Sequence, residues 1–159
     1  MHRTAMTPFA KARLIALLLP AALMAGALGS QYLGGLYPCE MCHWQRWPHY
    51  AAIVIAALAF VLRSVARPLV LLAALAILAS GLIGAFHAGV EYGWWEGLTR
   101  CSTLSQGGSL ADILATPLVR CDAPQWALAG ISLAGWNALF SIGGFVAIVM
   151  LWLKHPRSR

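Results

Sequence analysis

Four long runs without a charged residue constrain this chain more than any other feature, because each approaches the length of a bilayer crossing. They cover residues 14–36, 47–62, 68–90 and 132–153. A transmembrane helix needs about 20 mostly apolar residues, so the second run is expected to borrow a turn and span 44–62. Backbone in lipid must satisfy its own hydrogen bonds, which favours helices. The sequence therefore predicts an all-α membrane protein built as a four-helix transmembrane bundle.

The composition supports the same class. Sixty per cent of the 159 residues are hydrophobic and only 10% are charged, whereas a soluble domain carries about 25% charged residues. A soluble protein of this length would need far more polar surface. Nothing divides the chain internally, so residues 1–159 are expected to form one membrane domain.

The charges are sorted between the connections of these runs. Eight basic residues and no acidic ones lie in the two terminal tails and the link between runs two and three: Arg3, Lys11, Arg13, Arg63, Arg67, Lys154, Arg157 and Arg159. The remaining connections, loops 37–46 and 91–131, hold all five acidic residues. Since basic residues mark the cytoplasmic face, both termini are expected inside and both loops in the periplasm. The net charge of +6 then reflects topology, and we expect no nucleic-acid partner.

The first run has a second interpretation. Its basic start, apolar stretch and small residues resemble a secretory signal peptide that would be cleaved near Ser30. The apolar character continues through "QYLGGLY", beyond the usual length of about 7–15 residues for such a stretch. We therefore expect it to be retained as a span, and sequencing the mature N-terminus would distinguish the two.

The four cysteines, Cys39, Cys42, Cys101 and Cys121, all fall in the two expected periplasmic loops. Disulfides persist outside the inner membrane, so four cysteines suggest two pairs. Two structural disulfides are one interpretation. However, a C-x-x-C disulfide closes too short a loop to remove much chain entropy, whereas a twenty-residue loop gains about 3 kcal/mol. The first pair is better suited to repeated opening and closing.

The position of the first pair on its helix favours a reactive thiolate. If the helix begins near Pro38, a favoured first-turn residue, the sulfurs lie at the positive end of the helix dipole. Positions 39, 42, 46 and 49 share one helical face, so Arg46 is expected to lower the pKa of a neighbouring thiol. The bland alternative is an arginine that extends from a helix end to the membrane surface.

The run Cys39-Glu40-Met41-Cys42-His43 also has the pattern of a haem attachment site. Haem would need a second axial ligand and a covering pocket, and it would leave Cys101 and Cys121 unexplained. Zinc sites usually combine two close pairs, but the second pair is twenty residues apart. No metal is therefore expected. No glycine fingerprint for a nucleotide cofactor is present, so a redox dithiol here points to an acceptor dissolved in the membrane, a quinone.

Three segments together resemble the DsbB disulfide-bond formation proteins: "PCEMCHWQRW", "FHAGVEYGWWEGLTRC" and "CDAPQWALAGISLAGWNALFS". The resemblance covers nearly the whole chain. It implies that Cys101 forms the mixed disulfide with a reduced DsbA-like partner and that Cys121 resolves it. It also implies that Cys39 exchanges with the second pair through a bridge to Cys121. Cys42 would be the thiolate that contacts the quinone.

The resemblance implies two further site residues. Arg46 would stabilise the Cys42 thiolate and the reduced quinone, and His87 corresponds to a histidine on the quinone side. Gln45 departs from family members that carry Glu there, which leaves the proton donor to the quinone open. Glu40 inside the motif adds a negative charge that opposes thiolate formation.

The predicted function is a quinone-dependent thiol oxidase of the bacterial inner membrane that supports oxidative protein folding. It would reoxidise a periplasmic DsbA-like protein and pass two electrons to ubiquinone or menaquinone. Reoxidising a disulfide of roughly −120 mV requires a more oxidising acceptor, and a quinone fits that need. Two alternatives remain. One is a quinone reductase of the vitamin K epoxide reductase type, and the other is a membrane protein whose disulfides are only structural.

Overall fold

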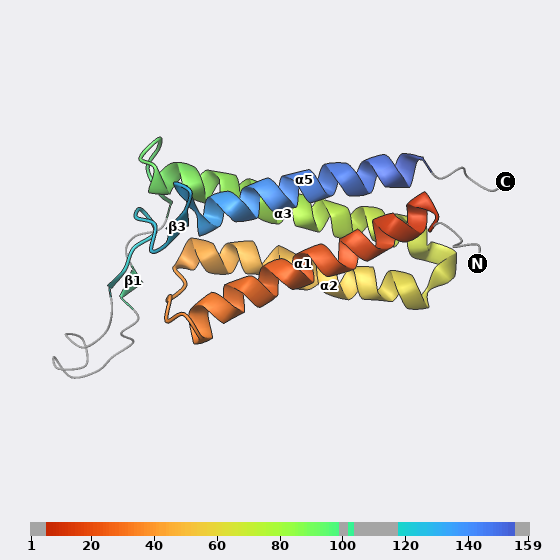
Figure 1. Ribbon diagram of the computed structural model, residues 1–159, viewed down its shortest axis with the longest axis horizontal. Helices are drawn as coiled ribbons and strands as arrows, with labels where there is room; N and C mark the ends of the chain where they lie inside the picture. The colour runs from red at the N-terminus through yellow and green to blue at the C-terminus, as the bar shows by residue number, and fades with distance from the viewer. Residues whose placement is uncertain (1–5, 99–101, 104–117, 155–159) are drawn as a thin grey trace.

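The computed structural model describes residues 6–98, 102–103 and 118–154, and most of them are helical. Within these ranges there are four long α-helices: α1 (Pro8–Tyr32), α2 (Glu40–Val61), α3 (Ala66–Glu91) and α5 (Leu133–Leu153). A short 3₁₀ turn, η1 (Arg63–Val65), joins α2 to α3. The four helices lie side by side along the long axis of the molecule (Figure 1). The predicted helical class is confirmed.

Three of these helical segments are long and apolar enough to cross a membrane: Pro8–Tyr32, Arg63–Glu91 and Leu133–Leu153. Four were expected, and α2 is the one that does not qualify in the described chain. Its first half carries polar side chains, among them Gln45, Arg46 and His49, which lower its mean hydropathy. The helix is therefore present, but its first half has the polar composition of a functional site and only its second half has that of a membrane span.

Local sequence explains where the helices begin. The Thr7 side chain accepts a hydrogen bond from the Ala10 amide (3.2 Å), and Pro8 occupies the first turn, where its missing N–H costs nothing. Helix α1 thus starts six residues before the apolar run does. It ends four residues before the run ends, and Gly35 in the following turn has a φ of 67°.

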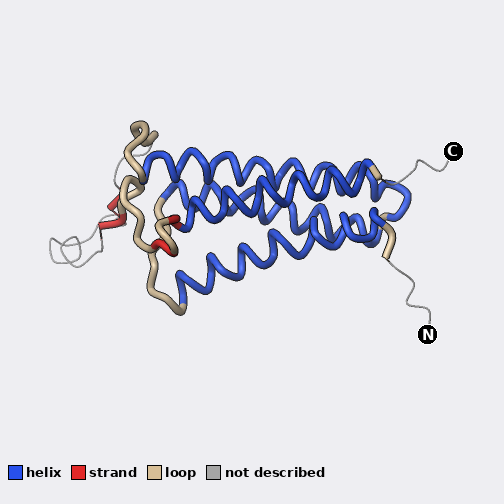
Figure 2. Tube along the Cα trace, turned by 45° about the horizontal axis from the view of Figure 1, so that its top comes forward, coloured by secondary structure: helices blue, strands red, loops and turns tan. Residues whose placement is uncertain are grey.

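The helices form a closed ring in the order α1, α2, α3, α5. Each contacts its two neighbours, and α1 and α3 touch only weakly across the centre (Figure 2). The start of α1, η1 and the end of α5 lie at one end of the bundle, and the strands lie at the other (Figure 1). We refer to these as the basic end and the loop end.

Small residues fill the interior near the basic end, while large apolar side chains point outward. The buried cluster there is mostly alanine: Ala12, Ala16, Ala52, Ala56, Ala59, Ala66, Val70, Ala73, Ala74, Ile77 and Ile148. Exposed side chains include Leu18, Val54, Leu58, Leu72, Leu75, Leu82, Leu139, Val146 and Met150. Close helix contact through small residues and an apolar outer surface are typical of helices packed in lipid.

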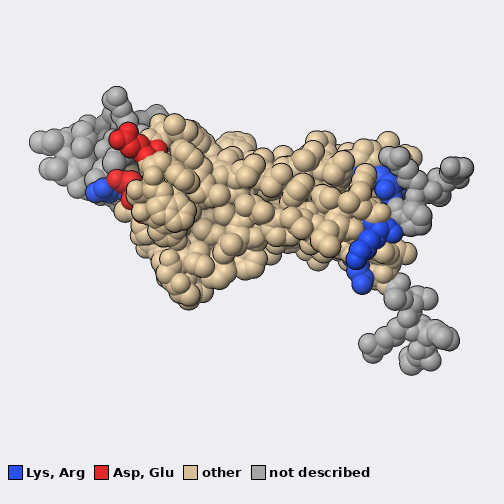
Figure 3. Space-filling view, turned by 90° about the horizontal axis from the view of Figure 1, so that it is seen from above, with Lys and Arg blue, Asp and Glu red and all other residues tan. Residues whose placement is uncertain are grey.

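Charges separate between the two ends in space as they do in sequence. Among the described residues, the basic end carries Lys11, Arg13, Arg63, Arg67 and Lys154, whereas Glu40, Glu91, Glu96, Asp122, Arg46 and Arg120 belong to the loop end. Figure 3 shows an uncharged belt between the two groups on the face in view. An uncharged belt between charged ends is the surface expected of a membrane protein.

Two short ladders shape the loop end. Strand β1 (Ser102–Thr103) pairs antiparallel with β2 (Leu118–Val119), with Ser102 opposite Val119. Strand β3 (Ala127–Leu128) pairs with β4 (Ile131–Ser132) across a two-residue turn in which Ala129 and Gly130 both have positive φ. Such a turn suits a tight hairpin. The Tyr92 hydroxyl donates to the Gly130 carbonyl (3.2 Å), which ties this hairpin to the end of α3.

The segment after α3 folds back on the helix. Gly93, with a φ of 71°, reverses the chain, and the Trp95 ring then lies directly over Gly89, where a Cβ would collide with it. The Trp95 indole N–H donates to the Phe86 carbonyl (2.9 Å). These contacts explain the glycine and tryptophan pattern of "FHAGVEYGWW" and hold the end of α3 at the loop end.

Candidate functional site

The dithiol lies at the first turn of α2, as the sequence predicts. The helix begins at Glu40, and Cys39 is its N-cap: the Cys39 sulfur accepts a hydrogen bond from the Cys42 amide (3.3 Å). The two sulfurs are 3.0 Å apart, and both residues are free thiols. Cys39 is only 2% exposed, whereas Cys42 is half-buried. The two cysteines therefore occupy different environments.

The two thiols also differ in acidity. The pKa of Cys39 is raised, first because its S–H donates a hydrogen bond to Cys42 and then because it is buried. The pKa of Cys42, which precedes the expected span 44–62, is lowered, chiefly because it accepts that hydrogen bond. Arg46 acts in the same direction but contributes less. Cys42 is thus the more acidic of the two thiols.

Cys121 reaches the same place from the other loop. It is buried in one apolar cluster with Cys39, Met41, Val90 and Val119. Its flanking residues are exposed, and the Arg120 guanidinium donates to both oxygens of the Asp122 carboxylate (2.9 and 2.7 Å). The cysteine between them packs into the cluster.

Cys101, the remaining predicted cysteine, lies outside the described residues. Its chain neighbour Ser102 is opposite Val119 in the β1–β2 ladder, and Val119 is two residues before Cys121. The two ends of the 101–121 loop are therefore paired at their base. The predicted exchange between Cys101 and Cys121 stays a prediction.

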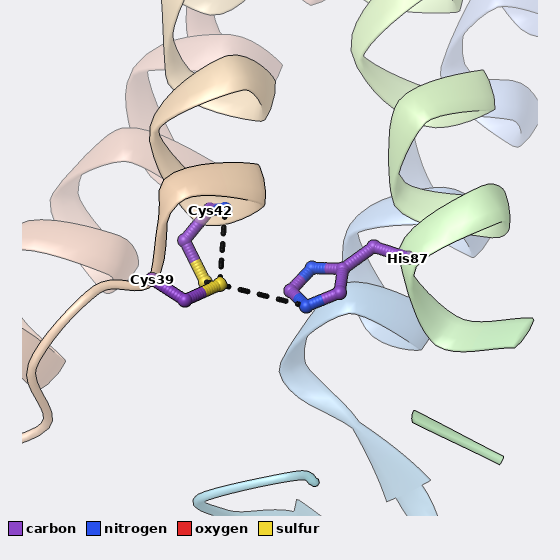
Figure 4. Close-up of side chains that lie close together, drawn as sticks. All are labelled: Cys39, Cys42 and His87. Atoms are coloured by element: carbon purple, nitrogen blue, oxygen red, sulfur yellow. Dashed lines mark hydrogen bonds between the residues drawn. The ribbon is translucent and has the colours of Figure 1, made fainter. Parts of the chain in front are cut away.

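His87 on α3 is the third side chain at the dithiol. It is 1% exposed, and its Nε2 atom lies 3.6 Å from the Cys39 sulfur. Figure 4 shows the imidazole pointing from α3 toward the two sulfurs at the start of α2. The Glu91 carboxylate, one turn further along α3, lies 3.7 Å from the same nitrogen. The ligand atoms of Cys39, Cys42 and His87 all lie within 4.8 Å of one another, which is close enough to hold a metal ion.

Arg46 and His49 do not share the single stripe that the spacing suggests. Arg46 turns toward α1, where it donates to the Gln31 side chain (2.6 Å) and the Ala27 carbonyl (3.2 Å). His49 faces the bundle interior, and its Nε2 atom lies 2.9 Å from Asn137 Oδ1. The predicted electrostatic partner of the thiolate thus mainly joins two helices, and His49 belongs to a separate polar cluster.

A pocket opens beside the dithiol at the loop end. Its walls come from all four helices, the turn before α2 and the segment before the β3–β4 hairpin: Ala27, Ser30, Leu36, Tyr37, Pro38, Cys39, Cys42, Gln45, Arg46, His87, Glu91, Arg120, Ala123, Gln125, Trp126, Leu133, Ala134 and Asn137. The lining is mainly apolar, with a few polar groups directed into it. That composition suits a flat apolar ligand with polar edges.

The polar cluster below the pocket was missed by the sequence analysis, apart from Gln45 and His49. Asn137 on α5 is its centre, with Ser80 on α3 and Ser141 on α5 hydrogen-bonded around it. The available signal was an asparagine within an apolar run, because a polar side chain at such a place is costly unless it has partners. Its partners lie on other helices and only the fold reveals them.

This arrangement has a definite chemical capacity. A thiolate at Cys42 adjoins an apolar pocket, while its partner Cys39 is buried against a cysteine of the second loop. Disulfide exchange needs a thiolate close to a second sulfur, and Cys39, Cys42 and Cys121 are gathered in one cluster.

Comparison with known proteins agrees with this geometry. The family model described as "Disulfide bond formation protein DsbB" matches residues 10–152. The chain is also 26% identical over 136 residues to "Uncharacterized protein RP370" of Rickettsia prowazekii (strain Madrid E), covering 81% of this chain and 78% of the relative. No solved structure matches at a significant level. Because the family match spans nearly the whole chain and includes the dithiol, the chain belongs to the DsbB family of disulfide bond formation proteins.

Proposed function

We propose that this protein is a quinone-dependent thiol oxidase of the bacterial inner membrane that reoxidises a DsbA-like dithiol protein in the periplasm. Family membership already indicates a membrane protein with disulfide oxidoreductase chemistry. The proposal adds the electron donor, the acceptor and the residues that connect them. The dithiol supports it most, because both of its cysteines line the pocket and Cys39 also lies in one buried cluster with Cys121.

The pocket fits a quinone ring. Its walls are mainly apolar, and the Arg46 guanidinium and the His87 imidazole lie among them. Both can donate hydrogen bonds to a carbonyl oxygen. When bound, a quinone accepts two electrons and two protons. Of the carboxyl groups in the described part of the chain, only Glu91 lines this pocket.

The proposed exchange moves one electron pair through three disulfides. The partner's thiolate attacks the Cys101–Cys121 disulfide at Cys101 and frees the Cys121 thiolate. The partner's second thiolate then attacks this mixed disulfide, which releases the oxidised partner and leaves Cys101 as a thiolate. The Cys121 thiolate attacks Cys39, the Cys39–Cys42 bond breaks, and Cys42 leaves as the thiolate. The Cys101 thiolate next attacks Cys121, which restores that disulfide and leaves Cys39 as a thiol. Cys42 then delivers the pair to the acceptor and the Cys39–Cys42 disulfide reforms.

The test is direct. Purified protein in lipid nanodiscs is mixed with a reduced DsbA-like protein and with ubiquinone or, separately, menaquinone. We expect the ultraviolet absorbance of the quinone to fall as one partner disulfide forms per quinone reduced. The variant Cys42→Ser removes the thiolate that adjoins the pocket, so quinone reduction should stop.

The control is a variant that lacks only the loop pair, in which Cys101 and Cys121 are both serine. It should lose turnover with the protein partner but keep quinone reduction driven by a small dithiol such as dithiothreitol. Full turnover in Cys42→Ser, or partner oxidation without any quinone, would contradict the proposal. Retention of all function in a Cys39→Ser, Cys42→Ser double variant would favour purely structural disulfides.

A further inference from the structure

Two side-chain amides, the buried Gln45 and the half-buried Asn137, form a hydrogen-bonded chain that ends on His87. Gln45 on α2 is 7% exposed, and its Nε2 atom lies 2.8 Å from His87 Nδ1. Its Oε1 atom accepts a hydrogen bond from Asn137 Nδ2 on α5 (2.9 Å). Three helices thus meet through these two amides directly beneath the dithiol.

The orientation of both amides is fixed by groups that can only accept. Gln45 Nε2 donates to the Met41 carbonyl (3.2 Å), and Asn137 Nδ2 donates to the Ser80 carbonyl (3.2 Å). A backbone carbonyl has no hydrogen to give, so neither amide can be reversed without losing a buried bond. The two hydrogens of Gln45 Nε2 therefore go to Met41 and to His87.

This orientation determines where His87 carries its proton. A neutral imidazole has one donor nitrogen and one acceptor nitrogen. Because Nδ1 faces the Gln45 amino group, Nδ1 must be the acceptor and the hydrogen must be on Nε2. The two groups opposite Nε2 agree with this assignment, since the Cys39 sulfur (3.6 Å) and the Glu91 carboxylate (3.7 Å) both accept.

We propose that Gln45 and Asn137 are positioning residues that hold His87 in its Nε2–H tautomer, so that the dithiol faces a hydrogen-bond donor and the Cys39–Cys42–His87 cluster is closed to metal ions. The identification of the cluster as a working dithiol rests on the proposed function. The tautomer itself follows from the hydrogen bonds alone.

The Nε2–H tautomer matters because of how metal ions bind histidine. A pair of thiolates and an imidazole is a favourable ligand set for zinc and similar soft ions. A histidine ligand, however, binds through an unprotonated nitrogen and donates its other N–H to a carboxylate or carbonyl. Here the neighbour of Nδ1 is a donor, so the imidazole presents N–H to the sulfurs. A bound ion would occupy the thiolates that must exchange, and the Nε2–H tautomer opposes the binding of such an ion.

The first test uses the unmodified protein. In ¹⁵N-labelled reduced protein, the nitrogen shifts and ring couplings of His87, assigned by their loss in His87→Ala, distinguish the tautomers. We expect a pyridine-type Nδ1 and a pyrrole-type Nε2. A pyridine-type Nε2 in this spectrum would overturn the proposal.

The second test replaces the hydrogen-bond donor at His87 Nδ1 by an acceptor. In Gln45→Glu the carboxylate can only accept, so it favours a hydrogen on Nδ1 and leaves a lone pair on Nε2 facing the sulfurs. Reduced Gln45→Glu is titrated with CdCl₂ and followed by sulfur-to-cadmium absorbance. We expect cadmium affinity to rise at least tenfold over the unmodified protein, which is within the range of about 10–100-fold for changes beside metal ligands.

Three control variants test whether the gain in cadmium affinity comes from the His87 tautomer. Ala127→Glu adds the same charge at the loop end, on an exposed residue of β3 that does not line the pocket, and should leave cadmium affinity unchanged. Adding His87→Ala to Gln45→Glu should abolish the gain. Asn137→Ala leaves Gln45 held by Met41 alone and should give a mixed tautomer with a smaller gain.

Equal cadmium affinity in Gln45→Glu and the unmodified protein, or a gain that persists without His87, would overturn the proposal. Neither readout uses a quinone or a protein partner. An inactive oxidase with the Nε2–H tautomer intact would therefore count against the proposed function alone. If Gln45→Glu does not fold, the spectrum of the unmodified protein still decides the tautomer.

Discussion

Cys39 and Cys42 are three positions apart, yet the fold shifts the pKa values of their thiols in opposite directions. Cys39 is buried at the N-cap and its pKa is raised, whereas the pKa of Cys42 is lowered because it accepts the hydrogen bond from Cys39. A thiolate is the reactive form of cysteine. This difference supports the proposal that Cys42 delivers the electrons.

This asymmetry predicts a selective alkylation. In the reduced protein, iodoacetamide should modify Cys42 at least tenfold faster than Cys39 near neutral pH, as measured by mass spectrometry of the peptides. A lowered pKa keeps the thiolate populated at lower pH, so removing the donor in Cys39→Ala should move the rate profile of Cys42 to higher pH. Cys121→Ala keeps that donor and should leave the profile in place. Equal rates at the two cysteines would contradict the assignment.

The family resemblance named Cys42 as the thiolate, and that role stays a prediction. The sequence analysis gave the wrong weight to the causes of its lowered pKa. Spacing alone pointed to Arg46, because a cation one turn from a thiol is visible in a linear pattern. The larger effect, the hydrogen bond from Cys39, depends on the cap geometry of the first turn. His87 was found only through the family resemblance, since no periodicity relates a residue on α3 to the start of α2.

At the scale of elements, the contact between α3 and α5 depends on two glycines. A Cβ at Gly81 would lie 2.9 Å from the Ser141 Cβ, and one at Gly84 would lie 2.9 Å from Asn137 Nδ2 and 3.1 Å from Gln45 Oε1. All three distances are shorter than ordinary packing allows. The absence of these side chains lets α5 bring Asn137 to the amide chain.

We therefore expect Gly84→Ala to destabilise the bundle. Overpacking of this kind costs about 1–3 kcal/mol, and it should also separate Asn137 from Gln45. Gly143→Ala on the same helix pair is the matched control, because a Cβ there meets nothing within 4 Å and alanine is the better helix former by about 1 kcal/mol. Thermal unfolding in detergent should show a lower midpoint for the first variant only. Equal midpoints would contradict the packing argument.

Helix existence was predictable and helix composition was partly misjudged. Long uncharged runs located all four described helices because chain length and apolarity are properties of sequence alone. Helix α2 was expected to be a full span, but its first half carries polar side chains that line the candidate site. The early start of α1 at Pro8 followed from Thr7, a cap that the apolar pattern does not contain.

The whole molecule separates its charges along the bundle axis. In the described chain, five of the seven basic side chains lie at one end, and all the acidic ones lie at the other end together with Arg46 and Arg120. If the basic end faces the cytoplasm, the cysteines face the periplasm, and a soluble partner can reach them. Ser64, in η1, and Glu96, after α3, lie at opposite ends and are both exposed.

Single-cysteine labelling tests this orientation. In a background without the four native cysteines, Glu96→Cys should react with a membrane-impermeant maleimide added to intact spheroplasts. Ser64→Cys should react only after the membrane is permeabilised, because basic segments are retained inside. The reverse labelling pattern would place the dithiol in the cytoplasm and exclude a periplasmic partner.

The helix ring and the polar cluster lay beyond the reach of the sequence. An apolar run looks alike from every side, so it does not reveal which face meets which neighbour. The ring order became visible only with the structure, as did the meeting of Gln45, His87 and Asn137 from three helices. The β1–β2 and β3–β4 ladders have two residues per strand, too short for any periodicity to indicate.

The described hydrophobic core toward the basic end is alanine, valine and isoleucine. Such a medium strongly disfavours a moving ion. In the proposed reaction, the hydrogen ions taken up by the reduced acceptor would then come from the compartment that receives those given up by the oxidised client. Turnover by this route would be electroneutral, because no net charge would cross the membrane.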